Sequence, residues 1–410
     1  MIDGWLSLIA REWRFLLFGL TCTFLSGPGQ TFFIGLFTPH FGAAIGLGPS
    51  GLGMLYMAAT LSASVLMAYA GQFIDRIDLG HYLGIVATGL ALACLAMALA
   101  SGMVLLFFAL LLLRLTGQGL MGHIGITAIA RHYDRRRGKA LAIVSAGYPL
   151  SEGLMPPLAA FLIATFGWRP AYGATGLFVL GMLLLVLLPL IAGKTGFRAP
   201  PPGSRSASAP RPLDGARIVL STRFFWLALP ALVFMPFAST ALVFHIQSIA
   251  MLRAWPDSLP ALAFPFYAAA HVLALPVAGQ IIDRFGARRG LFAVTLPAGL
   301  GMVLLGLWSA EAALFAFLGG LGFSAGLAQT VVSATWPEVY GIERLGAVRS
   351  FAVMLMVAGS ALGPPLFGLA IDLGLGLDVM SLALAALGMV ASGLAVLAAS
   401  RPVSPSRNAT

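Results

Sequence analysis

Charged residues are scarce in this chain of 410 residues. Asp, Glu, Lys and Arg make up only 9% of it, whereas 59% is hydrophobic and the mean hydropathy is +0.95. Soluble domains carry roughly 25% charged residues. A chain with so little charge cannot cover a water-exposed surface of its size, so it must present apolar surface to lipid. The composition therefore excludes an ordinary soluble globular protein.

Cysteine is also scarce, because only Cys22 and Cys94 are present and both lie in apolar segments far apart in the sequence. They are interpreted as small buried apolar side chains, and neither a disulfide nor a metal site is expected. A nucleotide-binding Gly-rich Lys loop, a metal-ligand cluster and a nucleophile constellation are missing from the sequence. We therefore expect no enzyme, no cofactor and no bound metal.

Acidic residues are fewer than basic ones, 14 against 24, which gives a formal net charge of +10. In a soluble protein this excess would indicate nucleic acid as a partner. In a membrane protein, basic residues collect in the loops that stay cytoplasmic. The excess is therefore interpreted as topology, and the expected partner is the lipid bilayer rather than nucleic acid.

Long apolar runs are abundant. A spanning helix needs about 20 mostly apolar residues, and roughly twelve such segments can be counted. In the first half they cover 14–38, 50–71, 80–100, 104–130, 139–165 and 170–192. In the second half they cover 223–250, 259–281, 289–308, 311–336, 347–371 and 377–399.

A repeated hexapeptide divides the chain. Gly71-Gln-Phe-Ile-Asp-Arg76 returns as Gly279-Gln-Ile-Ile-Asp-Arg284 about half a chain later, and each copy follows a long apolar segment. The repeat predicts a duplicated membrane protein. The predicted domains are an N-terminal six-helix bundle over 1–192, a Pro-, Gly- and Ser-rich linker over 193–222, a C-terminal six-helix bundle over 223–400 and a disordered tail over 401–410.

The basic residues predict the orientation. If both termini and the linker lie on one side, that side holds nearly all of the 24 Lys and Arg residues. The opposite side has only Arg169 and Arg253, and Arg114 lies within a span. Such an imbalance predicts cytoplasmic termini and linker. The chain is expected to be an integral protein of the cell (inner) membrane.

Six plus six helices, a central linker and a Gly-x-x-x-Asp-Arg turn repeated between helices 2–3 and 8–9 resemble the major facilitator superfamily over essentially the whole chain. The resemblance implies an all-α membrane protein with twelve transmembrane helices in two pseudo-symmetric bundles. Shorter motifs at 114–119, 135–141 and 166–169 resemble the same family. Residues 359–368, followed by Asp372, resemble helix 11 of its monocarboxylate and oxalate–formate transporter-like branch.

The repeated turns are candidate cytoplasmic gates. Glycine lets helices approach closely, a carboxylate gains from a helix N-terminus, and Arg offers a fork to acceptors across the seam. The first turn departs from the family pattern at Asp78 and His81, so better-formed contacts are expected around the second. The alternative is a plain charged turn at the membrane edge. The candidate gate residues are Gly71, Asp75, Arg76, Gly279, Asp283 and Arg284.

Arg114 and Glu152 carry fixed charges within the hydrocarbon depth, and each costs at least about 2–3 kcal/mol there. Counted along antiparallel helices 4 and 5 they reach similar depth, which predicts a direct or water-bridged pair. Arg114 could attract an anionic substrate, and Glu152 could accept a proton on desolvation and couple it to alternating access. The family's helix-4 Arg is implicated in proton coupling. The alternative is a static pair that fixes packing.

Other polar side chains in the spans complete the predicted pathway. Pro28 breaks the first span, and irregular backbone at this depth is tolerated only beside protein or a water-filled cavity. The resemblance implies that helices 1, 4, 7 and 10 line the cavity, and histidine titrates near neutrality. The alternative is polar glue between helices. The remaining pathway candidates are Gln30, Gln118, His123, Gln247, His271 and Gln329.

These observations leave several functions open. The first is a monomeric, proton-coupled secondary active transporter of a small organic anion such as a monocarboxylate, because Arg114 is a buried cation. The second is a proton-driven drug or metabolite exporter, because Glu152 and a hydrophobic cavity suit cationic or neutral cargo. A non-transporting receptor or scaffold is the third, and the absence of a large soluble domain argues against it.

Overall fold

The computed structural model describes residues 2–133, 136–192, 217–341 and 345–400, with side chains from residue 7 onward. Those ranges are almost entirely helical and contain no strand. Most of the predicted linker, and the whole of the predicted tail at 401–410, lie outside the described residues. The prediction of an all-α protein is confirmed.

Within the described residues, eleven helices are long and apolar enough to cross a membrane. They match eleven of the predicted segments, so the chain is an integral membrane protein. They are Pro49–Asp75, Leu79–Leu99, Met103–His132, Arg137–Phe166, Trp168–Ile191, Arg223–Phe244, Leu259–Phe285, Ala287–Leu307, Ala312–Tyr340, Leu345–Asp372 and Leu377–Ser400.

The remaining predicted segment, 14–38, is helical but broken. Its backbone passes from α1 (Ile2–Phe24) through a 3₁₀ turn, η1 (Gly27–Gly29), before it becomes helical again. Pro28 lies in this turn, where it cannot donate a backbone hydrogen bond. The helical pieces that follow are α2 (Thr31–Ile34), η2 (Gly35–Phe37) and α3 (Thr38–Ile45).

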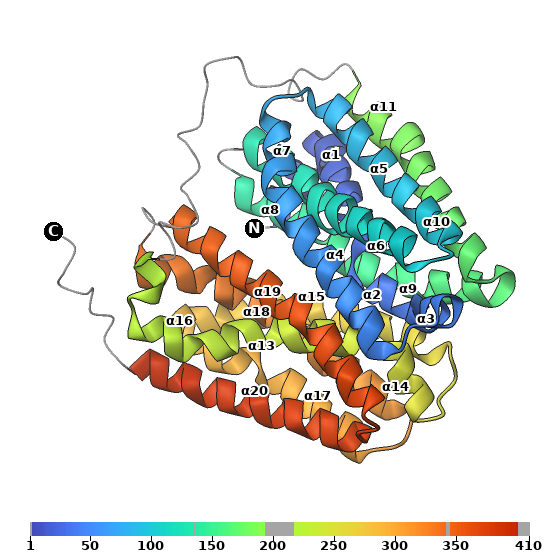
Figure 1. The fold of residues 1–410 in the computed structure, drawn as a ribbon. Helices are drawn as coiled ribbons and strands as arrows, with labels where there is room; N and C mark the ends of the chain where they lie inside the picture. The colour runs from blue at the N-terminus through green and yellow to red at the C-terminus, as the bar shows by residue number, and fades with distance from the viewer. Residues whose placement is uncertain (1, 134–135, 193–216, 342–344, 401–410) are drawn as a thin grey trace. The chain divides into compact units, whose positions relative to one another are not determined.

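The chain forms two compact units. Unit 1 comprises Met1–Leu47 and Met54–Ser204. After α3 its elements are α4 (Pro49–Ala70), η3 (Gly71–Asp75), α5 (Leu79–Leu99), α6 (Met103–Leu112), η4 (Leu113–Met121), α7 (Gly122–His132), α8 (Arg137–Ser145), α9 (Gly147–Phe166), α10 (Trp168–Met182), η5 (Leu183–Leu187) and α11 (Leu188–Ile191). In this unit α5 and α10 run side by side (Figure 1).

Unit 2 comprises Gly48–Gly53 and Arg205–Thr410. Its elements are α13 (Arg223–Phe244), α14 (Ile246–Leu252), α15 (Leu259–Phe285), α16 (Ala287–Gly290), η7 (Leu291–Val294), α17 (Leu296–Leu307), α18 (Ala312–Tyr340), α19 (Leu345–Asp372) and α20 (Leu377–Ser400). Helices α13 and α20 lie side by side (Figure 1).

Glycine residues let helices α15 and α18 of unit 2 pack closely. A Cβ atom on Gly322 of α18 would lie 2.8 Å from the carbonyl carbon of Tyr267 in α15. One turn later, a Cβ on Gly326 would lie 2.7 Å from the side chain of Ala274. Small residues in this spacing let two membrane helices approach backbone to backbone. The crossing fixes the side chains that follow it on both helices.

A short segment departs from the predicted division at 192. Residues Gly48–Gly53, which include the start of α4, group with unit 2. The backbone N–H of Ser50 donates to the carboxylate of Asp372 at 3.0 Å. A carboxylate at a helix N-terminus satisfies orphan N–H groups and gains from the helix dipole. Asp372 therefore has a capping role that the sequence motif alone did not indicate.

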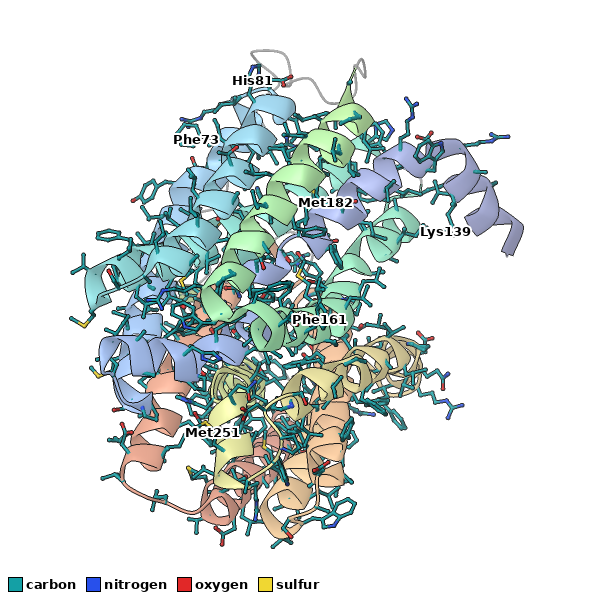
Figure 2. All side chains as sticks on the ribbon, turned by 90° about the vertical axis from the view of Figure 1, so that its right-hand side faces the viewer. Phe73, His81, Lys139, Phe161, Met182 and Met251 are labelled. Atoms are coloured by element: carbon teal, nitrogen blue, oxygen red, sulfur yellow. The ribbon has the colours of Figure 1, made fainter. Side chains whose placement is uncertain are left out.

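Large apolar side chains are exposed in both units. Phe161 on α9 is 62% exposed and Met251 on α14 is 60% exposed, and both project from their helices (Figure 2). Phe73 also lies exposed near one end of α4 (Figure 2). Such side chains suit a lipid environment, where apolar surface needs no covering.

The two arginines that break the charge pattern act as helix C-caps. Arg169 donates to the carbonyl oxygen of Ala100 at 2.9 Å, just after the end of α5. Arg253 donates to the carbonyl oxygens of Leu305 and Gly306, at 3.0 and 2.7 Å, at the end of α17. Arg side chains here satisfy carbonyls that have no intrahelical partner. These two residues therefore have a structural reason to lie on the predicted outer side.

Candidate functional site

The candidate site lies where two irregular helices cross in unit 1. The predicted fourth span is α-helical in α6 and α7 but π-helical over η4 (Leu113–Met121) between them. π-Helical segments are rare and occur frequently at functional sites. The 3₁₀ turn η1 of the first span packs against η4. Two non-α segments therefore meet inside the apolar part of one unit.

Glycines make this crossing possible. A Cβ atom on Gly29 would lie 2.5 Å from the backbone nitrogen of Gln118, and closer still to the carbonyl oxygen of Leu113. A Cβ on Gly117 would lie 2.8 Å from the Cα of Gly29. Real Cβ atoms essentially never approach other atoms below 3.0 Å. Both positions therefore require glycine, and the irregular backbone of η1 is buried against protein rather than lipid.

Arg114, in the first turn of η4, is 4% exposed. Its Nη1 donates to the carbonyl oxygen of Gly29 at 3.1 Å. Its guanidinium lies 5.0 Å from the ring centroid of Tyr56 on α4, a cation–π distance. Among the described residues, its buried Nε has no hydrogen-bond partner. The site thus holds a buried cation with unused donor capacity.

Tyr56 is completely buried and is anchored from the other side of the break. Its hydroxyl shares a hydrogen bond of 2.7 Å with the Oγ1 of Thr31, the first residue of α2. The break in the first span therefore reaches Arg114 by two routes. Gly29 accepts a hydrogen bond from Arg114, and Thr31 holds the Tyr56 ring that lies against the guanidinium.

The predicted direct pair between Arg114 and Glu152 is not formed within the described residues. Arg114 contacts Gly29 and Tyr56 instead. Glu152 lies half-buried on α9. The 3₁₀ turn supplies the acceptor carbonyl for Arg114, and no residue pattern in the sequence indicates this contact.

Two predicted glutamines belong to the same crossing. Gln30 is the C-cap of η1 and the N-cap of α2, and its backbone N–H donates to the carbonyl oxygen of Gly27 at 2.9 Å. Gln118 is an exposed residue of η4 whose backbone nitrogen faces Gly29. The structure therefore brings Gln30, Gln118 and Arg114 to one region of unit 1, and their part in a transport pathway stays a prediction.

A polar stripe on α7 holds the first repeated turn. His123, Thr127 and Arg131 follow at intervals of four residues and so share one helix face. The Nδ1 of His123 bonds to the Oγ1 of Thr127 at 3.3 Å, and a Cβ on Gly71 would lie 3.8 Å from the Nε2 of His123. His123 therefore sits beside the residue that opens the turn.

Arg131 holds the other end of that turn. It forms an ion pair with Asp75 and donates to the carbonyl oxygen of Ile74 at 3.3 Å. Arg76 lies over the ring of Phe73, 5.8 Å from its centroid. The stripe of His123, Thr127 and Arg131 thus spans the turn from its first residue to its aspartate.

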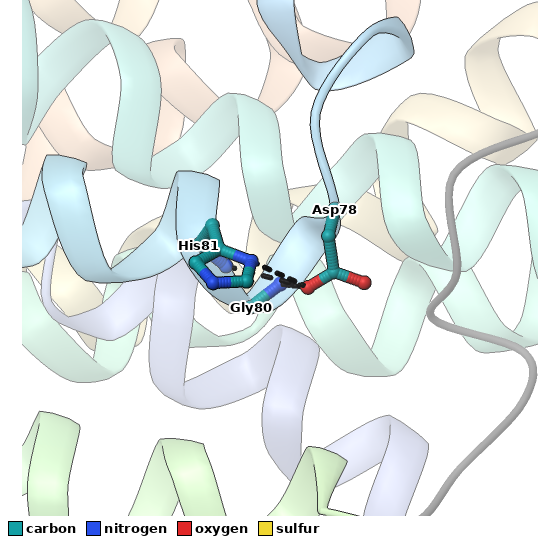
Figure 3. Close-up of polar contacts among 3 residues, drawn as sticks. All are labelled: Asp78, Gly80 and His81. Carbon is teal, nitrogen blue, oxygen red and sulfur yellow. Dashed lines mark hydrogen bonds and ion pairs between the residues drawn. The ribbon is translucent and has the colours of Figure 1, made fainter.

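Asp78, where the first turn departs from the family pattern, caps α5. Its Oδ1 accepts hydrogen bonds from the backbone N–H groups of Gly80 at 2.9 Å and His81 at 3.4 Å (Figure 3). The Nδ1 of His81 lies 3.5 Å from the same oxygen. This is an N-cap, a role that Asp fills well. Asp78, where the family pattern has glycine, therefore caps the N-terminus of α5.

The second turn is held by other residues than expected. Glu338 of α18 accepts from the backbone N–H groups of Ala287 at 2.6 Å and Arg288 at 3.3 Å. The side chain of Arg288 donates to the carbonyl oxygen of Ala399. The best-formed contacts were expected around Asp283 and Arg284 of the repeat, next to Gly279. In the described residues the ion pair lies at the first turn, and the second turn is fixed just beyond the repeat.

Two further pathway candidates, His271 and Gln329, are hydrogen-bonded to each other in unit 2. The Nε2 of His271 on α15 bonds to the Oε1 of Gln329 on α18 at 2.8 Å. His271 is buried, and the ring of Tyr267 lies edge-on to it at 6.2 Å. The pair follows the glycine crossing of α15 and α18. The structure therefore places a polar pair with a titratable member inside unit 2.

Gln247 has a more local role. Its Nε2 donates to the carbonyl oxygen of Asp257 at 3.1 Å, within the α14–α15 connection. Nearby, the Nε2 of His245 bonds to the carbonyl oxygen of Pro364 at 2.8 Å. Both bonds satisfy backbone carbonyls, as polar glue between helices does. Gln247 therefore has a structural partner in this conformation.

A cluster at the end of α7 was missed by sequence reasoning. The ring of His132 stacks on Phe15 at 3.8 Å between centroids, and its Nε2 lies 3.8 Å from the carboxylate of Glu12. Burial, and then the charge of Glu12, raise the pKa of the neighbouring Tyr133 hydroxyl, which stays protonated at neutral pH. The helix α1 is kinked at Glu12, where φ is −122° and ψ is 19°.

Comparisons with known proteins point to one family. The sequence model of the Major Facilitator Superfamily matches residues 19–270. Monocarboxylate transporter 11 of Mus musculus is 29% identical over 298 residues, which cover 66% of this chain and 61% of that protein. The chain thus spans about three fifths of that relative's length. The gallate transporter of Pseudomonas putida is 28% identical over 396 residues, 89% of this chain and 87% of that protein.

Solved structures show the same fold. The nucleoside transporter NupG superposes with a TM-score of 0.75 at 13% identity, over 94% of this chain and 98% of that one. A bacterial homologue of the human lysosomal transporter Spinster superposes with a TM-score of 0.64 at 16% identity, over 95% and 94% of the two chains. These identities support the fold alone. The sequence relatives are transporters and not enzymes.

Proposed function

Because the chain belongs to the Major Facilitator Superfamily, we propose that it is a secondary active transporter that carries a small carboxylate anion by alternating access. The observation that carries this proposal is Arg114, a buried cation whose Nε has no hydrogen-bond partner among the described residues. A charge in the membrane interior is costly and is retained where it lines a pathway or binds a ligand.

The chemistry of the relatives' substrates supports an anion. One relative is named for monocarboxylates and the other for gallate, the anion of an aromatic carboxylic acid. A guanidinium binds a planar carboxylate through parallel N–H donors. Arg114 lies where two helices lose α-helical geometry, and secondary transporters typically build substrate sites from discontinuous helices.

Proton coupling is part of the proposal. Histidine is the side chain that exchanges a proton near neutral pH, and His271 is held by Gln329 inside unit 2. Glu152 on α9 is the second candidate for the proton. A proton that enters with the anion would compensate its charge. In this account the first and second turns act as gates at the cytoplasmic end of a monomer in the inner membrane.

A second candidate function is a proton-driven exporter of cationic or neutral compounds. It is favoured by the half-buried carboxylate of Glu152, which Arg114 does not contact. A half-buried acidic side chain inside a membrane protein suits a cationic cargo. The two candidates differ in the sign of the charge that the transported compound carries.

Uptake by reconstituted protein distinguishes them. Proteoliposomes are loaded with a pH gradient and given labelled gallate, pyruvate and a lipophilic cation. The proposal predicts saturable uptake of a carboxylate that Arg114→Ala abolishes, with the variant still monodisperse in detergent. Arg11→Ala is the matched control, because Arg11 is an exposed arginine on α1. Uptake of the cation alone, or carboxylate uptake unchanged in Arg114→Ala, would contradict the proposal.

A further inference from the structure

The guanidinium of Arg114 is used on one side only. Its Nη1 is occupied by the carbonyl oxygen of Gly29, while Nε, on the opposite edge together with Nη2, is buried without a partner among the described residues. We infer that Arg114 presents its Nε–Nη2 edge to the substrate carboxylate, and that Tyr56 and Thr31 are positioning residues that set the direction of this edge. This inference rests on the proposed function, in which the substrate is a carboxylate.

Gly29 cannot move independently of η4. It is packed backbone to backbone against η4, through Gly117 and the nitrogen of Gln118. Its carbonyl oxygen is therefore a fixed acceptor on the same helix crossing that carries Arg114. A fixed acceptor on Nη1 leaves the guanidinium free to rotate only about the axis of that one hydrogen bond.

Tyr56 prevents the guanidinium of Arg114 from rotating about its hydrogen bond to Gly29. Its ring lies 5.0 Å from the guanidinium carbon, and a cation prefers the face of such a ring. The ring itself is held by the hydroxyl bond to Thr31 at 2.7 Å and by complete burial. Gly29 and Thr31 flank Gln30 in the same break, so one short segment fixes Arg114 from two sides.

The Nε–Nη2 edge of Arg114 also distinguishes a carboxylate from an amide. Two parallel N–H donors match the two oxygens of a planar carboxylate, and such a bidentate pair is short, strong and specific in geometry. A carboxamide offers only one acceptor oxygen to the same edge and brings an N–H₂ group against a donor. A buried donor left without a partner is costly, and a bound carboxylate removes that cost. The edge therefore selects a carboxylate over the matched amide.

The test uses variants that change the positioning contacts but keep Arg114. Tyr56→Phe removes the hydroxyl, Thr31→Val removes its partner, and Tyr56→Leu removes the ring. The probes are labelled gallate and pyruvate, with the corresponding amides as competitors, and the protein is the full chain in proteoliposomes. KM, kcat and the ratio of inhibition by acid and amide are measured for each variant.

We expect Tyr56→Leu to raise the KM for the transported carboxylate about tenfold while kcat changes less than about twofold, because ground-state positioning is lost. Tyr56→Phe and Thr31→Val should each raise KM about threefold, and the double variant no further, because both remove one hydrogen bond. Arg114→Lys keeps the charge but not the fork, so it should lose the preference for acid over amide.

Two results would overturn the inference while leaving the proposed function intact. One is wild-type transport that prefers acid over amide, with KM and preference unchanged in Tyr56→Leu. The other is an additive effect of Tyr56→Phe and Thr31→Val, which would show that they act separately. If Tyr56→Leu fails to fold, the two conservative variants and their double variant still decide. Wild-type protein that moves no carboxylate overturns both the inference and the proposed function.

Discussion

Because η1 and η4 cross so closely, adding one methyl group at Gly29 should lower both stability and transport. In Gly29→Ala the new Cβ would lie 2.5 Å from the nitrogen of Gln118, whereas ordinary contact begins at 3.4 Å. The two backbones must therefore separate by about 1 Å, and overpacking of this kind typically costs 1–3 kcal/mol. The same movement would withdraw the Gly29 carbonyl oxygen from Arg114, so stability and transport should fall together.

Gly84→Ala is the matched control. Gly84 lies within α5 of the same unit, and a Cβ there would have no neighbour within 4 Å. Alanine is favoured over glycine in a helix by about 1 kcal/mol, so this variant should be unchanged or slightly stabilised.

The assay for this pair is thermal unfolding of purified protein in detergent, followed by carboxylate uptake in proteoliposomes. Gly29→Ala should unfold at a temperature several degrees lower than both wild type and Gly84→Ala, and should lose most of its uptake. Equal unfolding temperatures and equal uptake for the two alanine variants would refute the close crossing and its link to Arg114.

Three further variants test the first turn, the N-cap of α5 and the proposed proton pathway. Asp75→Asn should change stability little, because exposed ion pairs contribute about 0–1 kcal/mol, but it should increase labelling of a cysteine placed beside the first turn; unchanged labelling would count against a gate. Asp78→Ala should lower the free energy of unfolding by about 1 kcal/mol through loss of the α5 N-cap, whereas Asp78→Asn should largely keep it, and denaturation of both variants checks this. His271→Gln should keep counterflow exchange but flatten the dependence of net uptake on pH; an unaltered pH profile would remove His271 from the proton pathway.

The fold was predictable because its determinants are local in sequence. Apolar runs of about 20 residues identify spans without any knowledge of their neighbours. Pro28, with glycine on both sides, also marked the break in the first span correctly. The repeated hexapeptide pointed to two similar halves, although the start of α4 groups with unit 2, where Asp372 accepts from its Ser50 N–H.

The contacts within the site were only partly predictable. Arg114 was identified as a buried charge, but its partners depend on the direction set by a π-helical segment. Tyr56 resembles any other apolar residue of a span in the sequence. Its role follows from the ring that faces Arg114 and from the hydroxyl that reaches Thr31.

The residues that hold the two turns illustrate the same limit. Asp75 was expected to act as a gate residue, but its partner Arg131 lies on another helix, 57 residues beyond the Ile74 carbonyl to which it also donates. Glu338 accepts a hydrogen bond from the backbone N–H of Ala287, which lies 51 residues earlier in the chain. No local pattern connects such pairs, and only the packing of helices brings them together.

The recognition of a transported carboxylate by Arg114 can be measured without a pH gradient. It is tested most directly by counterflow exchange in proteoliposomes loaded with unlabelled gallate or pyruvate, with the labelled acid outside and the amide as competitor. We expect saturable exchange that the acid inhibits and the amide does not, present in Arg11→Ala and absent in Arg114→Ala. Exchange that persists in Arg114→Ala, or wild-type protein that exchanges neither carboxylate, would contradict it.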